Sequence, residues 1–226
     1  MPSASGQGAV AIWHDIVPEG LAEFYAWHGE EHMPERVGIP GFLRGRRFRA
    51  IEASLEFFNL YETASPDVVA GPDYKARLDS PTPRTMSAVK HFRNVARSLC
   101  SVGAVAGEAQ GGTVATLRYE VREGGEEAHA AAMARTLVPD LATRAGIAAV
   151  RWLVADKAAS GYVNAEQRAR GAANAVPPYV LLCEGWGDPA QVTEALKAVL
   201  PAGRAVELGM HDMALDLYRH EVTVSR

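Results

Sequence analysis

The segment 27–36 (WHGEEHMPER) concentrates side chains that could transfer protons or bind a metal. An α-helix advances about 100° per residue, so residues three and four apart share a face. In a helix over 20–37, one face begins apolar and becomes ionisable toward its end: Leu21, Phe24, Tyr25, His28, His32 and Glu35. Buried ionisable groups cost free energy unless they are partnered. This face therefore indicates a candidate site.

His32 is the candidate general acid or base, because an imidazole with an ordinary pKa of about 6.5 transfers protons near neutral pH. Glu31, at the edge of the face, or Glu35 would orient His32 or raise its pKa. An alternative is that His32 hydrogen-bonds the backbone of a strand and holds the helix against the sheet, since buried polar groups are normally satisfied whatever their role. We expect the other inward side chains of this helix to bind the substrate: Phe24, Tyr25, Trp27 and His28.

A metal site is the competing interpretation of this helix. Residues 28–32 have the H-x-x-E-H order of inverzincin proteases, and two histidines at i and i+4 can share a zinc ion. However, Gly29 is a poor residue for the middle of a metal-holding helix, and no later acidic helix offers a third ligand. We therefore predict no metal and no cofactor, with incidental binding of a divalent cation by the two histidines as an alternative.

His14 is the candidate substrate-binding residue on the first predicted strand. It shares a strand face with Val10 and Ile12, and that face can point toward the helix. The alternative is a core histidine, since a lone histidine gives little specificity. Elsewhere the sequence has no Gly-x-Ser-x-Gly elbow, no phosphate loop and no dinucleotide fingerprint.

Arg46 belongs to a predicted strand that carries four arginines. The arginines either clamp an anionic substrate or keep an edge strand soluble and unpaired. Arg46 or Arg47 could instead pair with Glu35 or Glu62. Glu62 and Arg97 both lie on predicted strands and could also form a buried ion pair.

The elements that must position these residues follow the order β-α-β-β-α-β. Short β-rich runs separated by turn residues predict strands, and Ser65-Pro66 has the residue types that begin a helix. This order is the ferredoxin-like arrangement. The expected strands are 9–17, 42–50, 56–63 and 92–101, and the expected helices are 20–37 and 65 to about 90.

The rest of the chain repeats that order. Two echoes support a tandem repeat: Arg36-Val37-Gly38-Ile39 with Arg144-Ala145-Gly146-Ile147, and Leu60-Tyr61-Glu62 with Leu182-Cys183-Glu184. We predict an α+β fold of two tandem ferredoxin-like halves, 1–106 and 107–226, that form a dimeric α/β-barrel and are joined by a Gly- and Ala-rich linker. The expected strands of the second half are 112–121, 147–155, 178–186 and 205–224, with helices at 126–143 and 188–200.

The two predicted halves differ at the candidate site. Aligning Met33-Pro34 with Val138-Pro139 sets Glu31 and His32 against Thr136 and Leu137. The second half therefore loses the Glu-His pair, and its alanine-rich helix can approach the sheet closely. We predict a structural second half and one pocket per chain, in the first half, lined from 10–14, 24–35 and 42–62.

The composition limits the class of protein. The 226 residues are 48% hydrophobic and 22% charged with a net charge of −4, which is ordinary globular composition and does not indicate a nucleic-acid partner. The two cysteines fit no metal or redox spacing and suit a reducing compartment. We expect no signal peptide and no membrane span, and hence a cytoplasmic protein.

Several motifs together resemble the dimeric α/β-barrel (ferredoxin-like) superfamily, most of all bacterial EthD-like and antibiotic-monooxygenase-like members with a Glu-His pair on the first helix. The resemblance covers 9–100, whereas 112–226 agrees only in element order. It implies two four-stranded sheets closed into a barrel, with helices outside and small ligands between helix and sheet. The motifs are Trp13-x-Asp15, Trp27-x-x-x-Glu31-His32-x-Pro34-Glu35-Arg36, Pro40-Gly41-Phe42-x-x-x-Arg46-Arg47-Phe48, and Leu60-Tyr61-Glu62 followed by Ser65-Pro66 and Tyr74.

Members of that superfamily include cofactor-free oxygenases, isomerases, dehydratases and haem enzymes, so the fold does not fix the reaction. The first hypothesis is a cofactor-independent enzyme that acts on a small apolar or aromatic organic molecule by His32 acid–base chemistry. The alternative is a non-catalytic small-ligand-binding or assembly module of the same fold. A haem protein is a third possibility. The resemblance also implies a homo-oligomer, most simply a dimer.

Overall fold

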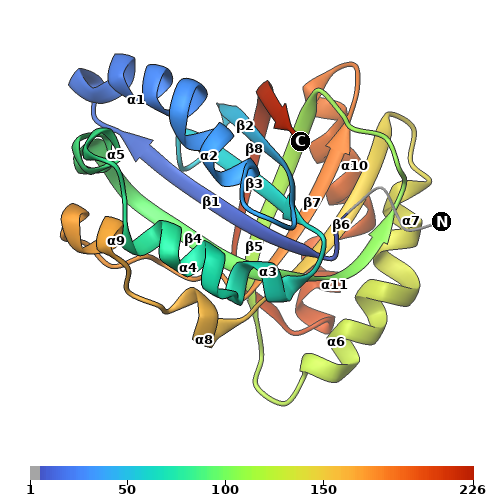
Figure 1. The fold of residues 1–226 in the computed structure, drawn as a ribbon. Coiled ribbons are helices and arrows are strands. Elements are labelled where there is room, and N and C mark those ends of the chain that lie inside the picture. Colours follow the sequence, from blue (N-terminus) through green and yellow to red (C-terminus); the bar gives the residue numbers. More distant parts are fainter. Residues whose placement is uncertain (1–5) are drawn as a thin grey trace.

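A closed antiparallel barrel of eight strands forms the centre of the computed structural model (Figure 1), which describes residues 6–226. The strand order around the barrel is β1-β3-β2-β8-β5-β7-β6-β4, and β4 closes the barrel against β1. The barrel is α+β in class, with all of its helices outside. The strands are β1 (Gly8–Ile16), β2 (Phe42–Glu52), β3 (Phe57–Thr63), β4 (Phe92–Ala106), β5 (Thr113–Val121), β6 (Ile147–Ala155), β7 (Tyr179–Gly185) and β8 (Met210–Ser225).

Two long-range strand pairs close the barrel. Strands β1 to β4 are neighbours in the order 4-1-3-2, and β5 to β8 are neighbours in the same relative order. The pairs β2·β8 and β4·β6 join these two sets, with Phe48 opposite His220 and Val102 opposite Leu153. A single chain therefore closes the barrel without unpaired sheet edges.

The helices cover the barrel on opposite sides (Figure 1). One group consists of α1 (Leu21–Trp27), α2 (Met33–Val37), α3 (Pro66–Ala70), α4 (Pro72–Asp79) and α5 (Pro83–Ala88). The other consists of α6 (Glu126–Ala132), α7 (Val138–Ala142), α10 (Pro189–Val199) and α11 (Ala202–Glu207). None of the described helices is long and apolar enough to cross a membrane.

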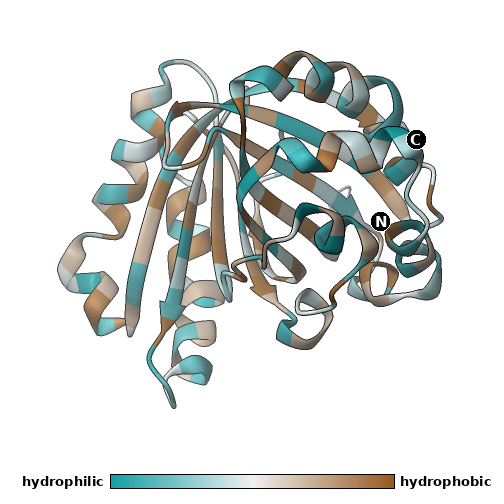
Figure 2. Cartoon of the chain, turned by 90° about the vertical axis from the view of Figure 1, so that its left-hand side faces the viewer, coloured by the Kyte–Doolittle hydropathy of each residue, from teal (hydrophilic) through white to brown (hydrophobic). Residues whose placement is uncertain are grey.

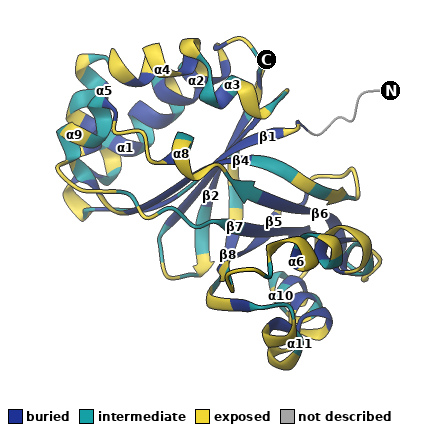
Figure 3. Cartoon of the chain, turned by 90° about the horizontal axis from the view of Figure 1, so that it is seen from below, coloured by how far each residue is buried: buried dark blue, intermediate teal, exposed yellow. Residues whose placement is uncertain are grey.

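A segment between β6 and β7 departs from the predicted pattern. It contains α8 (Lys157–Ser160) and α9 (Ala165–Arg170), which follow β6 in the chain but lie beside α4 and α5 (Figures 1 and 3). Backbone hydrogen bonds hold its end to β4: Ala175 N donates to Val95 O, and Arg97 N donates to Ala175 O. Residues 157–175 therefore cover the face of the sheet that the first group of helices also covers.

The expected first helix is interrupted by a π-helical turn. Residues 28–32 form this turn between α1 and α2, and 133–137 form a second one between α6 and α7. Each turn precedes a proline at the second position of the next helix, Pro34 or Pro139. Because proline has no N–H, it cannot make the regular i→i−4 hydrogen bond, and the N–H of Met33 bonds instead to the carbonyl of His28 five residues earlier.

Buried strand residues belong to one core inside the barrel and to others beneath the helices. Figure 2 shows apolar and hydrophilic residues interspersed along the strands, and Figure 3 shows that the strands are mostly buried. Trp13, Phe48, Phe58 and Tyr218 pack inside the barrel. Two further apolar cores lie outside the strands, beneath the first group of helices, and a fourth lies beneath α6, α7, α10 and α11. The period of two therefore fixes which residues of a strand can reach a helix.

Candidate functional site

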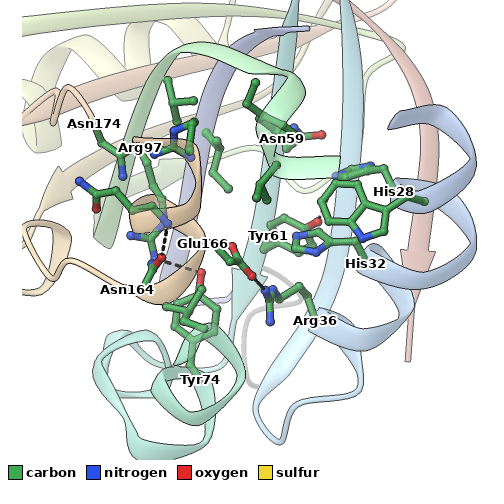
Figure 4. A pocket seen from close by; sticks show the side chains of 18 of the residues that line it. His28, His32, Arg36, Asn59, Tyr61, Tyr74, Arg97, Asn164, Glu166 and Asn174 are labelled. Carbon is green, nitrogen blue, oxygen red and sulfur yellow. Dashed lines mark hydrogen bonds and ion pairs between the residues drawn. The ribbon is translucent and has the colours of Figure 1, made fainter. Parts of the chain in front are cut away.

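A cavity of about 60 Å³ lies between the first helix and the sheet (Figure 4). One wall comes from the helix side, with Trp27, His28, His32 and Arg36. The floor comes from β1, β3 and β4, with Ile12, Asn59, Tyr61 and Arg97. Segment 157–175 supplies the opposite wall: Asn164, Glu166, Gln167, Arg170 and Asn174. The cavity is thus assembled from residues far apart in the chain.

His28 and His32 lie on the π turn with their rings stacked, 5.5 Å between centroids. Both are buried. Arg47 Nη1 donates to His28 Nδ1 at 3.3 Å, which leaves the proton on Nε2, 3.4 Å from the Tyr61 hydroxyl. His32 packs on Trp27 at 4.3 Å, and its Nδ1 has no hydrogen-bond partner among the described residues. Of the two, His32 has the free nitrogen.

Burial governs the protonation of these histidines. It lowers the pKa of His28 and of His32 well below the ordinary value of 6.5, and the positive charges of Arg47 and Arg36, respectively, lower them further. Both imidazoles are consequently neutral at pH 7. A neutral His32 with a free nitrogen can accept a proton or a hydrogen bond.

The structure does not bring Glu31 or Glu35 to His32. Glu31 accepts a hydrogen bond from Thr82 Oγ1 and lies 3.8 Å from Arg84. Glu35 pairs with Arg36 at 3.6 Å and with Arg77 at 3.3 Å. The extra residue of the π turn rotates the following helix, so that Arg36 rather than Glu35 faces the sheet.

Arg36 and Glu166 form an ion pair across the cavity (Figure 4). Arg36 is 2% exposed. Burial acts to lower its pKa, but the charge of Glu166, together with Tyr74, Glu35 and Tyr61, outweighs burial and raises the pKa. Burial raises the pKa of Glu166, while Arg36 and Arg97 oppose that change. This pair ties segment 157–175 to the first helix.

Arg97 and Tyr74 form the side of the cavity opposite the histidines (Figure 4). Arg97 Nη2 donates to the Tyr74 hydroxyl at 3.1 Å. Glu62 cannot pair with Arg97, because the two residues have opposite parity in the sheet: Ile12 lies opposite Arg97, whereas Ala9 lies opposite Glu62. Arg97 points to the helices and Glu62 into the barrel.

The other predicted binding residues lie around the cavity at different depths. Trp27 lines it and donates from Nε1 to Thr85 Oγ1 at 3.1 Å. Phe24 packs behind His28, 5.1 Å between ring centroids. Tyr25 lies outside, where its hydroxyl donates to Glu221 at 2.9 Å. His14 is a fully buried histidine behind the cavity, 2.9 Å from the Asn59 amide nitrogen.

Arg46 lies inside the barrel and does not line the cavity. It pairs with Glu184 through both terminal nitrogens, at 2.7 and 2.8 Å, and with Glu62 at 3.3 Å. Arg151 also pairs with Glu184. The expected partner Glu62 is therefore correct for Arg46, and the set links β2 and β3 to β6 and β7.

The corresponding face of the second half is packed with aromatic side chains. His129 on α6 is buried, bonded to the Tyr119 hydroxyl at 2.9 Å and to the Leu208 carbonyl at 3.1 Å. Tyr119 also accepts from Trp152 Nε1 at 2.9 Å, and Tyr179 stacks on the group. The inner face of this helix thus retains one histidine, and its polar atoms are satisfied.

Sequence reasoning missed most of the far wall of the cavity. Arg36 was hidden by the assumption of a regular helix. Glu166, Asn164 and Arg170 lie on segment 157–175, which the predicted repeat left without elements. One feature of the sequence could have indicated this extra segment. The connection between β6 and β7 is far longer than the one between the corresponding strands β2 and β3.

Comparisons with known proteins extend to the fold only. The sequence matches no family model and no curated protein. Among solved structures, an anthrone oxidase-like protein matches with a TM-score of 0.60 at 16% identity, covering 96% of this chain and 92% of that one. A Lactobacillus acidophilus protein with a suggested monooxygenase function gives 0.57 at 11% identity, covering 97% and 96%. A haem-binding protein from Thermus thermophilus gives 0.52 at 9% identity, covering 96% and 92%.

These structures share the architecture of this chain over nearly its whole length. They agree with the predicted α+β barrel with helices outside it. At such identities the similarity establishes the fold alone, and the chemistry must be argued from the cavity.

Proposed function

We propose that the chain is a cofactor-independent enzyme that removes a proton from a small, mostly apolar or aromatic organic molecule. The observation that carries the proposal is His32, a neutral imidazole whose Nδ1 is free among the described residues and which lines a cavity. Buried polar atoms are normally satisfied. A ligand in the cavity would supply the missing partner of this nitrogen, as would an ordered water molecule.

In the proposed step, a substrate C–H or O–H group transfers its proton to His32. The resulting negative charge would be stabilised by the cations of the cavity, since charge–charge interactions are stronger where water is excluded. His28 and Tyr61 would position His32 and the substrate. Oxygenation, isomerisation and dehydration can all begin with such a proton transfer.

Glu31 and Glu35 act at a distance in this proposal. Through Thr82, Arg84, Arg36 and Arg77 they hold the helix that carries His32. Arg36 and Glu166 take the place beside the substrate that we had expected of the two glutamates. The fold neighbours named for anthrone oxidase and monooxygenase activities support an enzyme of small molecules.

Haem does not fit the cavity as it stands, because a volume of about 60 Å³ is far smaller than a porphyrin, although His32 has a nitrogen that is free, among the described residues, to bind iron. His28 has both ring nitrogens within reach of protein partners. Among the described residues no cluster of three or more His, Cys, Asp and Glu is placed to hold a metal ion.

We further propose that the chain is a fused tandem of two ferredoxin-like halves, 1–106 and 107–226, of EthD-like ancestry. The two sets of strands have the same order, which supports this. The two π turns also begin 105 residues apart, the same spacing as the aligned Pro34 and Pro139. A homo-dimer and a cytoplasmic location remain predictions. Light scattering on the purified protein tests the first.

Deuterium exchange tests the enzyme proposal without knowledge of the complete reaction. Small carbon acids, such as aryl ketones and 1,3-diketones, are incubated with the protein in D2O, and loss of the acidic C–H resonance is followed by NMR. We expect exchange above the buffer rate, falling by about 100-fold in His32→Gln. His129→Gln is the matched control, because it alters a buried histidine on the corresponding helix.

Two results would contradict the proposal. One is exchange at equal rates in the wild type and His32→Gln. The other is binding of these compounds, seen as a raised melting temperature, without any exchange. The second result would favour the non-catalytic binding module.

A further inference from the structure

We propose that the cavity contains an anion subsite, formed by Arg97 and Arg170, that binds the carboxylate of a small apolar or aromatic acid. This inference rests on the proposed function, because it names the chemical class of the substrate. The evidence for the subsite itself is independent of His32.

Arg97 is a buried guanidinium that makes no direct ion pair with a carboxylate of residues 6–226, although the charge of Glu166 acts on it. It is 6% exposed and lines the cavity, and its Nη1 makes no hydrogen bond to any described residue. Its Nη2 donates to the neutral hydroxyl of Tyr74, 3.1 Å away. A buried charge is costly unless it is paired. An anionic ligand would supply the missing pair.

Arg170 adds a second cation on the facing segment. Its Nε is buried without a hydrogen-bond partner, and Nη2 donates to Asn174 Oδ1. No ion pair joins Arg170 to a carboxylate within residues 6–226. Burial lowers the pKa of Arg170, the charge of Glu166 opposes that change, and the charge of Arg97 adds to it. The two guanidinium groups repel each other, and the carboxylate that acts on both, Glu166, is already paired with Arg36.

The cavity has an excess of positive charge. Arg36, Arg97 and Arg170 line it, and the one lining carboxylate is Glu166, which is already paired with Arg36. Glu35 adds a charge on the outer side of Arg36. With one carboxylate for three guanidinium groups, the cavity keeps a net positive charge that an anionic ligand would offset.

The ligand class follows from the charges and the walls together. A planar guanidinium matches the two oxygens of a carboxylate. Part of the remaining surface is apolar and suits a hydrocarbon or aromatic body, whereas the rest carries amide, imidazole and phenol groups. The apolar lining residues include Ile12, Phe42, Leu78, Val89 and Val95. The product of proton loss would be a dianion, and the same cations would stabilise its second charge.

The approach to the cavity is also basic. A cleft of about 710 Å³ adjoins the cavity and shares Phe92, Val95 and Arg170 with it. Lys90 and Arg93 line this cleft as well. A cleft lined by one sign of charge attracts ligands of the opposite sign.

Calorimetric titration with paired probes tests the subsite. Benzoate and acetate are compared with benzamide and acetamide, which have nearly the same shape but no charge. We expect a carboxylate to bind at least 10-fold more tightly than its amide, because hydrogen bonds to charged groups are the stronger ones. Inorganic phosphate is included as an anion of a different shape.

Three variants test whether carboxylate binding depends on the charges of the subsite. Arg97→Met should reduce the affinity for the carboxylate about 10-fold or more and leave that for the amide unchanged. Glu166→Gln should increase carboxylate affinity, because it removes the competing negative charge, and it keeps the test open if Arg97→Met does not fold. Arg144→Gln, on an exposed arginine paired with Asp140, is the matched control and should change nothing.

Three results would overturn the inference. The first is equal affinity for carboxylate and amide, and the second is tighter binding of phosphate than of either carboxylate. The third is unchanged carboxylate binding in both Arg97→Met and Glu166→Gln. These outcomes leave the deuterium-exchange test of His32 unaffected. Conversely, Arg97-dependent carboxylate binding without any exchange would retain the subsite and refute the enzyme proposal.

Discussion

The buried ion network inside the barrel makes a strong prediction for Glu184→Gln. Glu184 is 1% exposed and accepts hydrogen bonds from Arg46, at 2.7 and 2.8 Å, from Arg151 and from the backbone N–H of Gly111, at 3.2 Å. The substitution keeps the size of the side chain and removes its charge. Arg44, Arg46 and Arg151 would then share Glu62 as their one carboxylate.

The expected cost is large because the arginines remain buried. Removing one partner of a buried ion pair costs about 3–5 kcal/mol, and the bidentate bonds to Arg46 place Glu184 in that range. For a chain of this length, a loss of about 4 kcal/mol lowers the melting temperature by roughly 8–16 °C. Since Arg46 belongs to β2 and Glu184 to β7, the loss weakens the joint between the two sets of strands.

The dependence of stability on acid pH should also reveal the contribution of Glu184. Burial acts to raise the pKa of Glu184, but the Arg46 hydrogen bonds and the charges of Arg46 and Arg151 outweigh it and hold the pKa below 4.5. A carboxyl with a depressed folded-state pKa stabilises the fold above its unfolded pKa, and that contribution is lost as the pH falls. Glu184→Gln should therefore lose stability at pH 7 and show a smaller further loss below about pH 4.3.

Urea denaturation and calorimetry measure both effects. Glu30→Gln is the matched control, because Glu30 pairs with Arg84 on the surface, and exposed pairs contribute about 0–1 kcal/mol. A loss below 1 kcal/mol in Glu184→Gln, or equal losses in the two variants, would refute the argument that the network is needed to compensate the buried arginines.

Two further predictions concern the site. Gly45→Ala should destabilise the protein by about 1–3 kcal/mol and weaken ligand binding, because a Cβ there would lie 2.6 Å from the ring of Tyr61, which lines the cavity. Chemical denaturation measures the loss of stability, and titration with benzoate measures the loss of binding. Unchanged stability would contradict this prediction. His14 should make the fold sensitive to mild acid, since burial lowers its pKa from 6.5 to about 3. A depressed pKa means that its contribution is full above pH 6.5 and declines as the pH falls, by about 2 kcal/mol at pH 5; a melting temperature equal at pH 7 and pH 5 would contradict this.

The periodicity of the sequence was sufficient for most of the elements. Alternation along 42–50 predicted β2, a short β-rich run at 56–63 predicted β3, and the turn residues between elements fixed their ends to within a few positions. The parity of a strand also placed His14 on the helix side, with Val10 and Ile12. These features are local, because each depends on residues that are neighbours along the chain.

The first helix shows where local reasoning fails. A regular helix over 20–37 would place Glu35 in line with His28 and His32. The π turn adds one residue to that line, so Arg36 faces the cavity instead. Proline at position 34 indicated an irregularity, but whether the helix kinks, ends or forms a π turn depends on what the turn packs against.

The sequence by itself determined most of the elements, their order and the helix that carries His28 and His32. Only the tertiary structure decided which side chains meet. Arg97, Glu166 and Arg170 become neighbours because segment 157–175 folds back across β4, and Arg46 of β2 meets Glu184 of β7 across the interior of the closed barrel. Such contacts depend on burial and charge balance among residues far apart in the chain, and no periodicity along the sequence records them.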